Sequence, residues 1–227
     1  MQGSVVLSEH VQFFVRWESR VTRSVYERAL GERFAELAPA LRRYCGPIPT
    51  GRVGIAEGAY EAVGPRWRIL RPILHALAAR DVLFPERGTD VPLAVENRYD
   101  ARGTLRAIRS FRLPGRERRM LDAMRVERGA LVDRLGRRGG LEVVLDAQVV
   151  DGGLVLASRA LAWHVGRRRV PLPPVASVEV RERVDDRTGL QHVDARVRAA
   201  LVGEVFRYTG AFAYRVERDA AASAPGG

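Results

Sequence analysis

One carboxylate interrupts an apolar row in a predicted strand. The segment from Ser177 to Val184 reads SVEVRERV, and successive side chains on a strand point to opposite faces. Glu182 therefore shares a face with the valines at 178, 180 and 184. Burying an isolated charge costs several kcal/mol, so this carboxylate needs a cation, a ligand or water as its partner.

Three more polar residues fall on apolar strand faces. Arg109 lies within the apolar row of TLRAIRSFRL, and Asn97 lies within that of VPLAVENRY. Tyr208 belongs to an aromatic row in the last predicted strand, EVFRYTGAFAYRV, where a buried phenol needs a hydrogen-bond partner. The pattern thus predicts several polar groups facing one apolar interior.

These four residues allow a structural and a functional interpretation. In the first, Glu182 and Arg109 form a buried ion pair that fixes strand register. In the second, Arg109, Glu182, Asn97 and Tyr208 are the convergent polar groups of a small-molecule pocket. An enzymatic alternative uses Glu182 as a general acid or base whose pKa is tuned by burial against Arg109.

Other chemically capable residues carry weaker signals. His192 and Asp194 lie near each other in sequence but face the solvent side of their predicted strand. Cys45 has no nearby histidine and is the single cysteine, and the four histidines lack metal-ligand spacing. No nucleotide-binding or hydrolase motif occurs. We therefore assign no catalytic residue, no metal and no cofactor.

Two helical segments are expected in the N-terminal half. The first starts at Ser24, with Glu27 completing a capping box, and is interrupted at Pro39. The second spans 65–81, with Pro65 in its first turn and a kink at Pro72. The second helix also carries Trp and arginines, so it suits either a cover over a sheet or a peripheral contact with an anionic membrane.

The rest of the chain alternates with period two. Short turns rich in Asp and Gly link the segments, as in antiparallel hairpins. The sequence therefore predicts an α+β fold in which a large curved antiparallel sheet, a barrel or half-barrel meander, is covered or plugged by two helices. We expect one domain over 25–217, an N-terminal extension over 1–24 and a disordered tail over 218–227. The predicted strands are 51–63, 91–99, 104–113, 141–150, 154–165, 177–184, 190–201 and 204–216.

The charge is strongly basic but dispersed. All 38 cations are arginine, against 27 acidic residues, giving a net charge of +11. The arginines are spread along the chain and few aromatic residues lie among them, which argues against nucleic-acid binding. No segment resembles a transmembrane helix or a secretory signal, which favours a cytoplasmic location.

Several stretches, in order, resemble a bacterial family known as domain of unknown function 4166. The similarity spans about Val25 to Val216. Its more specific pieces are FPERG, from Phe84 to Gly88, and PLP, from Pro171 to Pro173. The matching positions also include Arg109, Phe111, Glu182, Tyr208 and Gly210. Relatives often carry an aromatic residue two positions before the arginine, where this chain has Ala107.

The resemblance supplies no catalytic residues, but it implies one further role. Some relatives are joined to a nucleotide-binding oxidoreductase-like domain, which would make this domain an accessory to such an enzyme. From the residues themselves, the leading interpretation is a pocket inside the curved sheet for a small, partly apolar ligand. Arg109 and the net charge favour an anionic one.

Overall fold

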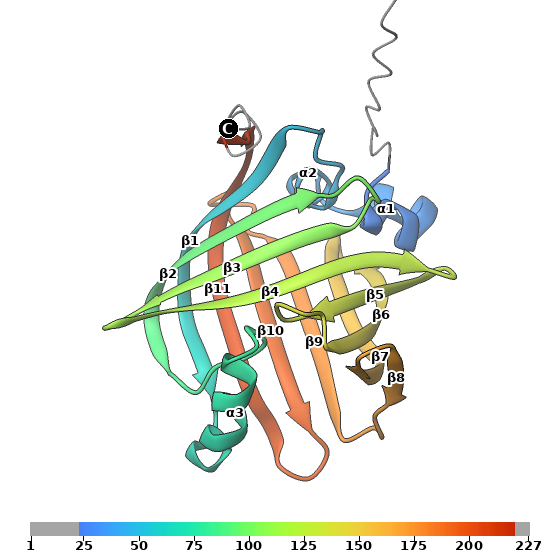
Figure 1. The fold of residues 1–227 in the computed structure, drawn as a ribbon. Coiled ribbons are helices and arrows are strands. Elements are labelled where there is room, and N and C mark those ends of the chain that lie inside the picture. The colour runs from blue at the N-terminus through green and yellow to red at the C-terminus, as the bar shows by residue number, and fades with distance from the viewer. Residues whose placement is uncertain (1–22, 221–227) are drawn as a thin grey trace, which may run out of the picture.

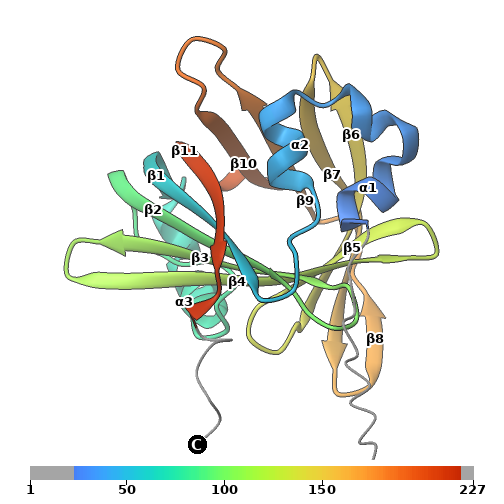
Figure 2. The same cartoon turned by 90° about the horizontal axis from the view of Figure 1, so that it is seen from above.

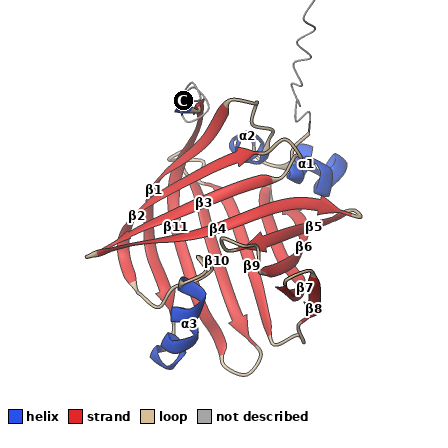
Figure 3. Ribbon diagram, viewed as in Figure 1, coloured by secondary structure: helices blue, strands red, loops and turns tan. Residues whose placement is uncertain are grey.

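The computed structural model describes residues 23–220, and most of its regular structure is strand (Figures 1 and 3). The helical elements are α1 (Val25–Leu30), the 3-10 helix η1 (Gly31–Glu36), α2 (Pro39–Cys45), the 3-10 helix η2 (Arg68–Leu70) and α3 (Arg71–Ala78). The strands are β1 (Arg52–Pro65), β2 (Gly88–Tyr99), β3 (Leu105–Leu113), β4 (Arg116–Glu127), β5 (Ala130–Leu135), β6 (Leu141–Val150), β7 (Gly153–Val165), β8 (Arg168–Pro171), β9 (Ala176–Val184), β10 (Gln191–Ala199) and β11 (Gly203–Arg218).

The strands form one antiparallel sheet that closes on itself. Its order is β6-β5-β4-β3-β2-β1-β11-β10-β9-β7-β8, and an additional pairing of β6 with β7 joins the two sides. Ten strands thus make the barrel wall, while β8 pairs only with the second half of β7. Closure leaves the wall without a free edge, so each barrel strand finds hydrogen-bond partners on both sides. The predicted α+β, barrel-like fold is confirmed.

Helices lie at both ends of the barrel. In Figure 1, α1 and α2 lie at the upper end, whereas α3, β8 and the hairpin between β10 and β11 lie at the lower end. The view onto the upper end shows the strands in a ring, with α1 and α2 over one side of it (Figure 2). These helices contact β4, β5, β6 and β9, so they cap that side of the barrel.

The first helical segment divides into three pieces. The predicted capping box forms, because the Ser24 hydroxyl accepts a hydrogen bond from the Glu27 N–H and the Glu27 carboxylate accepts one from the Ser24 N–H. Gly31 then ends α1 with a positive φ of 60°, and η1 leads to Pro39 in the first turn of α2. The break expected at Pro39 is therefore preceded by one at Gly31.

The second helix is shorter than the sequence predicts. Pro65 is the last residue of β1, paired with Phe206, and is not in a helix. Pro72 lies in the first turn of α3 and does not kink it, because a first-turn proline loses no intrahelical hydrogen bond. The helix that remains packs Leu70, Leu74 and Leu77 against the barrel core.

Three strands were not predicted from the pattern: β4, β5 and β8. Strands β4 and β5 carry Asp122 and Asp133 on their inward rows, which breaks the apolar alternation. Strand β8 is four residues long and exposed throughout. These inward carboxylates contributed to the failure of the sequence pattern to predict β4 and β5.

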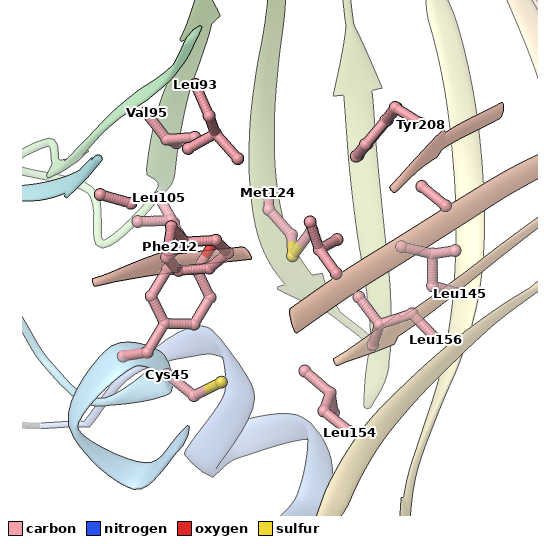
Figure 4. Close-up of a cluster of buried hydrophobic side chains, with 14 of the residues drawn as sticks. Cys45, Leu93, Val95, Leu105, Met124, Leu145, Leu154, Leu156, Tyr208 and Phe212 are labelled. Atoms are coloured by element: carbon pink, nitrogen blue, oxygen red, sulfur yellow. The ribbon is translucent and has the colours of Figure 1, made fainter. Parts of the chain in front are cut away.

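The barrel interior is packed mainly with aliphatic and aromatic side chains. Figure 4 shows part of this cluster, in which Leu93, Met124, Leu156 and Phe212 converge from different strands and Cys45 lies at the α2 end. Small residues allow the packing where β1 meets β11. A Cβ on Gly58 would lie 2.0 Å from the Ala211 carbonyl oxygen, so glycine permits the close approach of these strands.

Residues 1–22 and 221–227 lie outside the described part of the chain, and with them most of the expected N-terminal extension and C-terminal tail. Across residues 23–220, no helix combines the length and the apolar character that crossing a membrane requires.

Candidate functional site

Strand register directs all four predicted polar residues into the barrel. Asn97 pairs across β2–β3 with the buried Ala107, and Arg109 is two positions further along β3 on the same face. Glu182 of β9 pairs with the buried Val193, and Tyr208 of β11 with the buried Ala195. The inward orientation that strand alternation in the sequence predicts for these four side chains is therefore confirmed.

Arg109 forms its ion pair with a residue the sequence did not suggest. Its guanidinium donates a hydrogen bond to the Asp122 carboxylate, which projects inward from β4. Burial raises the pKa of Asp122, although Arg109 opposes that rise. Desolvation alone would lower the pKa of Arg109, but Asp122 and the surrounding tyrosines together raise it, so the guanidinium stays protonated.

Glu182 is held by an amide and makes no ion pair among the described residues. Gln191 of β10 donates its side-chain N–H to Glu182 Oε2 at 2.7 Å. Burial raises the pKa of Glu182 to about 7, against a lowering by the charge of Arg109 and by the Gln191 hydrogen bond. Arg109 thus acts on Glu182 through space, and the buried carboxyl titrates near neutral pH.

A third inward carboxylate, Asp133 of β5, is incompletely satisfied. It pairs across the sheet with Met124 and Val143, both in the core. Its Oδ1 is buried without a hydrogen-bond partner in the described chain. Burial and the nearby charge of Asp122 raise its pKa, and the backbone amides of Ala123 and Arg134 only partly oppose this.

Asn97 and Tyr208 occupy different surroundings. The Asn97 side chain interacts with the hydroxyl of Tyr44, which α2 brings into the upper part of the barrel. Tyr208 packs edge-on against Tyr60 and Phe111, with ring centroids 5.7 and 6.0 Å apart. Burial raises the pKa of Tyr208 above its ordinary value, so its phenol stays neutral.

The interior site therefore combines predicted and unpredicted residues. Asp122, Asp133 and Gln191 were missed because β4 and β5 were not predicted as strands and because Gln191 begins its strand. No group of three or more His, Cys, Asp and Glu side chains within residues 23–220 is arranged to hold a metal ion. The arrangement suits hydrogen bonding and proton exchange with a small molecule.

Arg109 keeps accessible surface although it faces inward. Its side chain is 21% exposed, and Tyr44, Tyr60 and Tyr208 lie close to it. Neighbouring inward residues Asp122 and Phe111 are buried. The exposed part of Arg109 indicates space for a solvent-sized molecule beside it.

A cavity of about 1170 Å³ opens at the lower end of the barrel. Leu135, Leu141 and Trp163, which are paired with one another along the β5–β6–β7 inward row, form its apolar side. Arginines from α3's C-terminal side and from the β5–β6 turn form its basic side, and Arg80 stacks over Trp163 at 5.7 Å. This cavity, called the mouth below, combines an apolar wall with guanidinium groups.

A second cavity of about 600 Å³ lies where the barrel seam divides. Strand β7 pairs with β9 only from Leu154 to Ala157, and beyond that point it pairs with β8. The Ser158 hydroxyl accepts a hydrogen bond from Val178 N–H and bridges the gap. The wall is thus least continuous at the lower end.

The weaker candidates do not join the interior polar site. His192 lies on the outward face, 3.9 Å from Asp185, while Asp194 pairs with Arg196 and Arg207. Cys45 is fully buried as a free thiol, and burial raises its pKa.

Fold and site together define a closed antiparallel barrel with an apolar interior that contains a small set of polar groups. The chain belongs to the family described as "Domain of unknown function (DUF4166)", which matches residues 37–212. It is also similar to the uncharacterized protein YndH of Bacillus subtilis (strain 168), with 27% identity over 139 residues, covering 57% of this chain and 67% of that protein. A bacterial relative agrees with the bacterial family that the sequence resembled.

One of the more specific stretches of that resemblance, FPERG, covers the β3 and β11 side of the lower end of the barrel. Phe84 is buried between Phe111 and Phe206, with ring centroids 4.9 and 5.2 Å away. Glu86 accepts hydrogen bonds from Arg116 and Arg118. The motif therefore has a structural explanation in the packing of the barrel end.

Proposed function

We propose that this protein binds a small, partly apolar molecule inside its barrel. The observation that carries the proposal is the buried Oδ1 of Asp133, which has no hydrogen-bond partner in the described chain. Buried polar atoms in native proteins almost always have a partner, because an unmade hydrogen bond costs about 1–3 kcal/mol. A polar group of a ligand that forms a hydrogen bond here would supply the missing partner.

The accessible surface of Arg109 gives the proposal a second support. The guanidinium has five N–H donors, and the ion pair with Asp122 uses only part of them. Space beside it would let a ligand acceptor reach the remaining donors. Apolar walls with a few convergent polar groups are typical of small-molecule sites.

The charges favour a ligand with a neutral, hydrogen-bonding body. Asp122 already neutralises Arg109, and the other inward carboxyls, Asp133 and Glu182, favour donors over a second anion. An anionic group of the ligand would instead fit the mouth, where Arg80, Arg137 and Arg138 line the cavity. We therefore keep the anionic ligand expected from the sequence but assign its charge to the mouth.

Native mass spectrometry of the purified protein tests the proposal. We expect a retained small molecule, or, after its removal, saturable binding of an anilinonaphthalene sulfonate dye. Asp133→Leu should lower retention, whereas the matched control Asp146→Leu, which removes an exposed carboxylate from β6, should not. Absence of both retention and dye binding in the wild-type protein would contradict the proposal.

A second candidate function is acid–base catalysis by Glu182. The supporting observation is its pKa of about 7, close to the value that suits a general acid or base at neutral pH. If this alternative is correct, a retained molecule should be converted over time, and Glu182→Gln should stop conversion while keeping binding. An unchanged ligand mass in both proteins would favour simple binding.

The remaining partner proposal is an accessory role beside a separate nucleotide-binding oxidoreductase, which rests on the family resemblance alone. Co-purification with an oxidoreductase from the source cells would support the accessory role.

A cytoplasmic location is also part of the proposal, since the described chain contains one buried free thiol and its interior depends on no disulfide.

A further inference from the structure

Exposed apolar side chains gather at one end of the barrel. Eight of the ten exposed large hydrophobic residues of the described chain lie at the lower end, and only Val150 and Val216 lie elsewhere. Three of the eight are in the segment of η2 and α3, namely Trp67, Ile69 and Ile73, the last two being 85% and 61% exposed. Single exposed apolar residues are ordinary, but a concentration at one end indicates an interaction surface.

The other five lie in the β10–β11 turn and in the segment around β8, both at the same end of the barrel (Figure 1). Leu201, at the tip of the β10–β11 hairpin, is 98% exposed, and Val202 follows it. Val165, Val170 and Val175 lie around the short strand β8. Side chains on protruding turns of this kind can insert into an apolar environment without any change in the fold of the barrel.

The same end is strongly basic. The connections at the lower end, residues 66–87, 136–140, 166–175 and 200–202, contain ten arginines and two acidic residues. Both acids are already paired, Asp81 with Arg137 and Glu86 with Arg116 and Arg118. Of the ten arginines, Arg137 pairs with Asp81 and Arg169 pairs with Glu142 of β6, while the others form no ion pair among the described residues and can meet anions from outside.

The upper end has the opposite balance. Its connections contain seven arginines and eight acidic residues, over 24–51, 100–104, 128–129, 151–152, 185–190 and 219. The net charge of +11 is thus unevenly distributed among the connections, and the excess lies at the end that also carries the apolar tips. Dispersion along the sequence hid this polarity, because each turn contributes only a few arginines.

The segment of η2 and α3 shows how the two properties combine. Leu70, Leu74 and Leu77 pack against the barrel core, while Ile69 and Ile73 point away from it. Exposed arginines at 66, 68 and 71 flank these isoleucines. An interfacial helix has this composition, with aliphatic and tryptophan side chains for the lipid and arginines for the headgroups.

We propose that the lower end of the barrel docks on an anionic lipid bilayer, with Trp67, Ile69, Ile73 and Leu201 entering the headgroup boundary and the arginines contacting lipid phosphates. Nucleic acid would use the arginines but would leave the aliphatic tips in water. The mouth cavity of about 1170 Å³ opens among the same turns, so docking would place this cavity against the lipid. The proposal does not depend on a ligand being bound inside the barrel.

Vesicle co-sedimentation tests the docking surface. The full chain should bind vesicles containing phosphatidylglycerol and should bind pure phosphatidylcholine vesicles at least about tenfold more weakly. Binding to the anionic vesicles should fall as the salt concentration rises. Absence of binding to anionic vesicles at low salt would overturn the proposal. So would equal binding to both vesicle types.

Matched variants at the two ends separate a docking face from general charge. Ile69→Glu combined with Leu201→Glu should reduce vesicle binding by roughly tenfold or more, whereas Val150→Glu should leave it unchanged. Likewise, Arg167→Gln with Arg168→Gln should weaken binding strongly, and Arg42→Gln with Arg43→Gln should not. Equal losses from both ends would overturn the proposal, since binding would then follow net charge alone.

Two other occupants of this surface have distinct outcomes. If duplex DNA displaces the protein from vesicles and binds the Ile69→Glu and Leu201→Glu variant as well as the wild type, the face recognises nucleic acid and the proposal fails. If the wild type is a dimer in size-exclusion chromatography and this variant is a monomer, the face is a self-interface and the proposal also fails. If the variants keep the oligomeric mass and the fold of the wild type but lose vesicle binding, the result supports lipid docking.

Discussion

Three inward carboxyl groups surround one guanidinium in the barrel, and this imbalance controls the protonation of the site. Asp122 takes the ion pair with Arg109, so Asp133 and Glu182 have no second cation in the described chain. Burial then raises the pKa of each of the three carboxyls, by disfavouring the charged form. The interior can hold protons near neutral pH, which couples the stability of the barrel to pH.

Replacing Glu182 with Gln should stabilise the protein at alkaline pH. The pKa of Glu182 is about 7 in the folded state against an ordinary 4.5, so its stabilising, neutral form is fully present below about pH 4.5 and is lost as pH rises through about 7. Glutamine cannot ionise and can still accept the hydrogen bond from Gln191. We expect the variant to gain roughly 3 kcal/mol or less at about pH 8 and almost nothing at about pH 4.

Urea unfolding across this pH range measures the effect. Glu179→Gln is the matched control, since Glu179 lies on the outward face of the same strand beside Arg181. A loss of stability in Glu182→Gln at about pH 8 would mean that an ionised Glu182 is paired with a cation after all.

Arg109 should couple to Asp122 more strongly than to Glu182. Arg109→Met alone leaves the buried Asp122 without its cation, at a cost of about 3–5 kcal/mol, while Arg109→Met with Asp122→Asn removes both charges and should recover most of it. A double-mutant cycle from denaturant unfolding gives the coupling energy. A cycle of Arg109 with Glu182 serves as the comparison, and a larger coupling there would restore the pair that the sequence suggested.

At the scale of elements, alternation in the sequence was sufficient for eight strands but not for β4 and β5. One inward polar residue did not hide β2, β3 or β9, but β4 has two charged residues, Arg118 and Asp122, on its inward row. Strand β5 has only six residues, with Asp133 in its inward row. Asp122 and Asp133 also complete the interior site, so the sequence pattern missed the strands and the site residues together.

For the helices, the sequence predicts local capping correctly but not the length of each helix. The capping box of Ser24 and Glu27 is a local interaction within four residues, and the sequence predicts it correctly. The extent of each helix depends on tertiary contacts, such as the Ala38 N–H that donates to the Gly152 carbonyl in the β6–β7 turn. Pairing of Pro65 with Phe206 likewise extends β1 where a helix was expected.

Ser24→Ala should lower the free energy of unfolding by about 1 kcal/mol. The substitution removes the hydroxyl that accepts the Glu27 N–H at 3.0 Å, and Ser24 is fully buried. Thermal and urea unfolding measure the loss. Ser177→Ala, on an exposed strand position, is the control and should change stability by less than about 0.5 kcal/mol; an equal effect of the two would contradict a capping role.

For the whole molecule, the two ends of the barrel differ in how they are closed. At the upper end, α1 and α2 bury Tyr26, Leu41 and Cys45. At the lower end, β7 leaves β9 after Ala157 and a cavity opens beside Leu141. If the barrel binds a small molecule as proposed, the ligand should therefore enter at the lower end.

Thiol labelling can decide which end opens. Cys45 is the single cysteine, is fully buried near the upper end and has a raised pKa, so a thiol reagent such as dithiobisnitrobenzoate should modify it only as fast as the protein unfolds. Leu141→Cys, made in a Cys45→Ala background, places the thiol at the lower mouth and should react in the native state, at least about tenfold faster. Fast native labelling of Cys45, with Leu141→Cys slow, would mean that the helical cap opens and that the lower end is sealed.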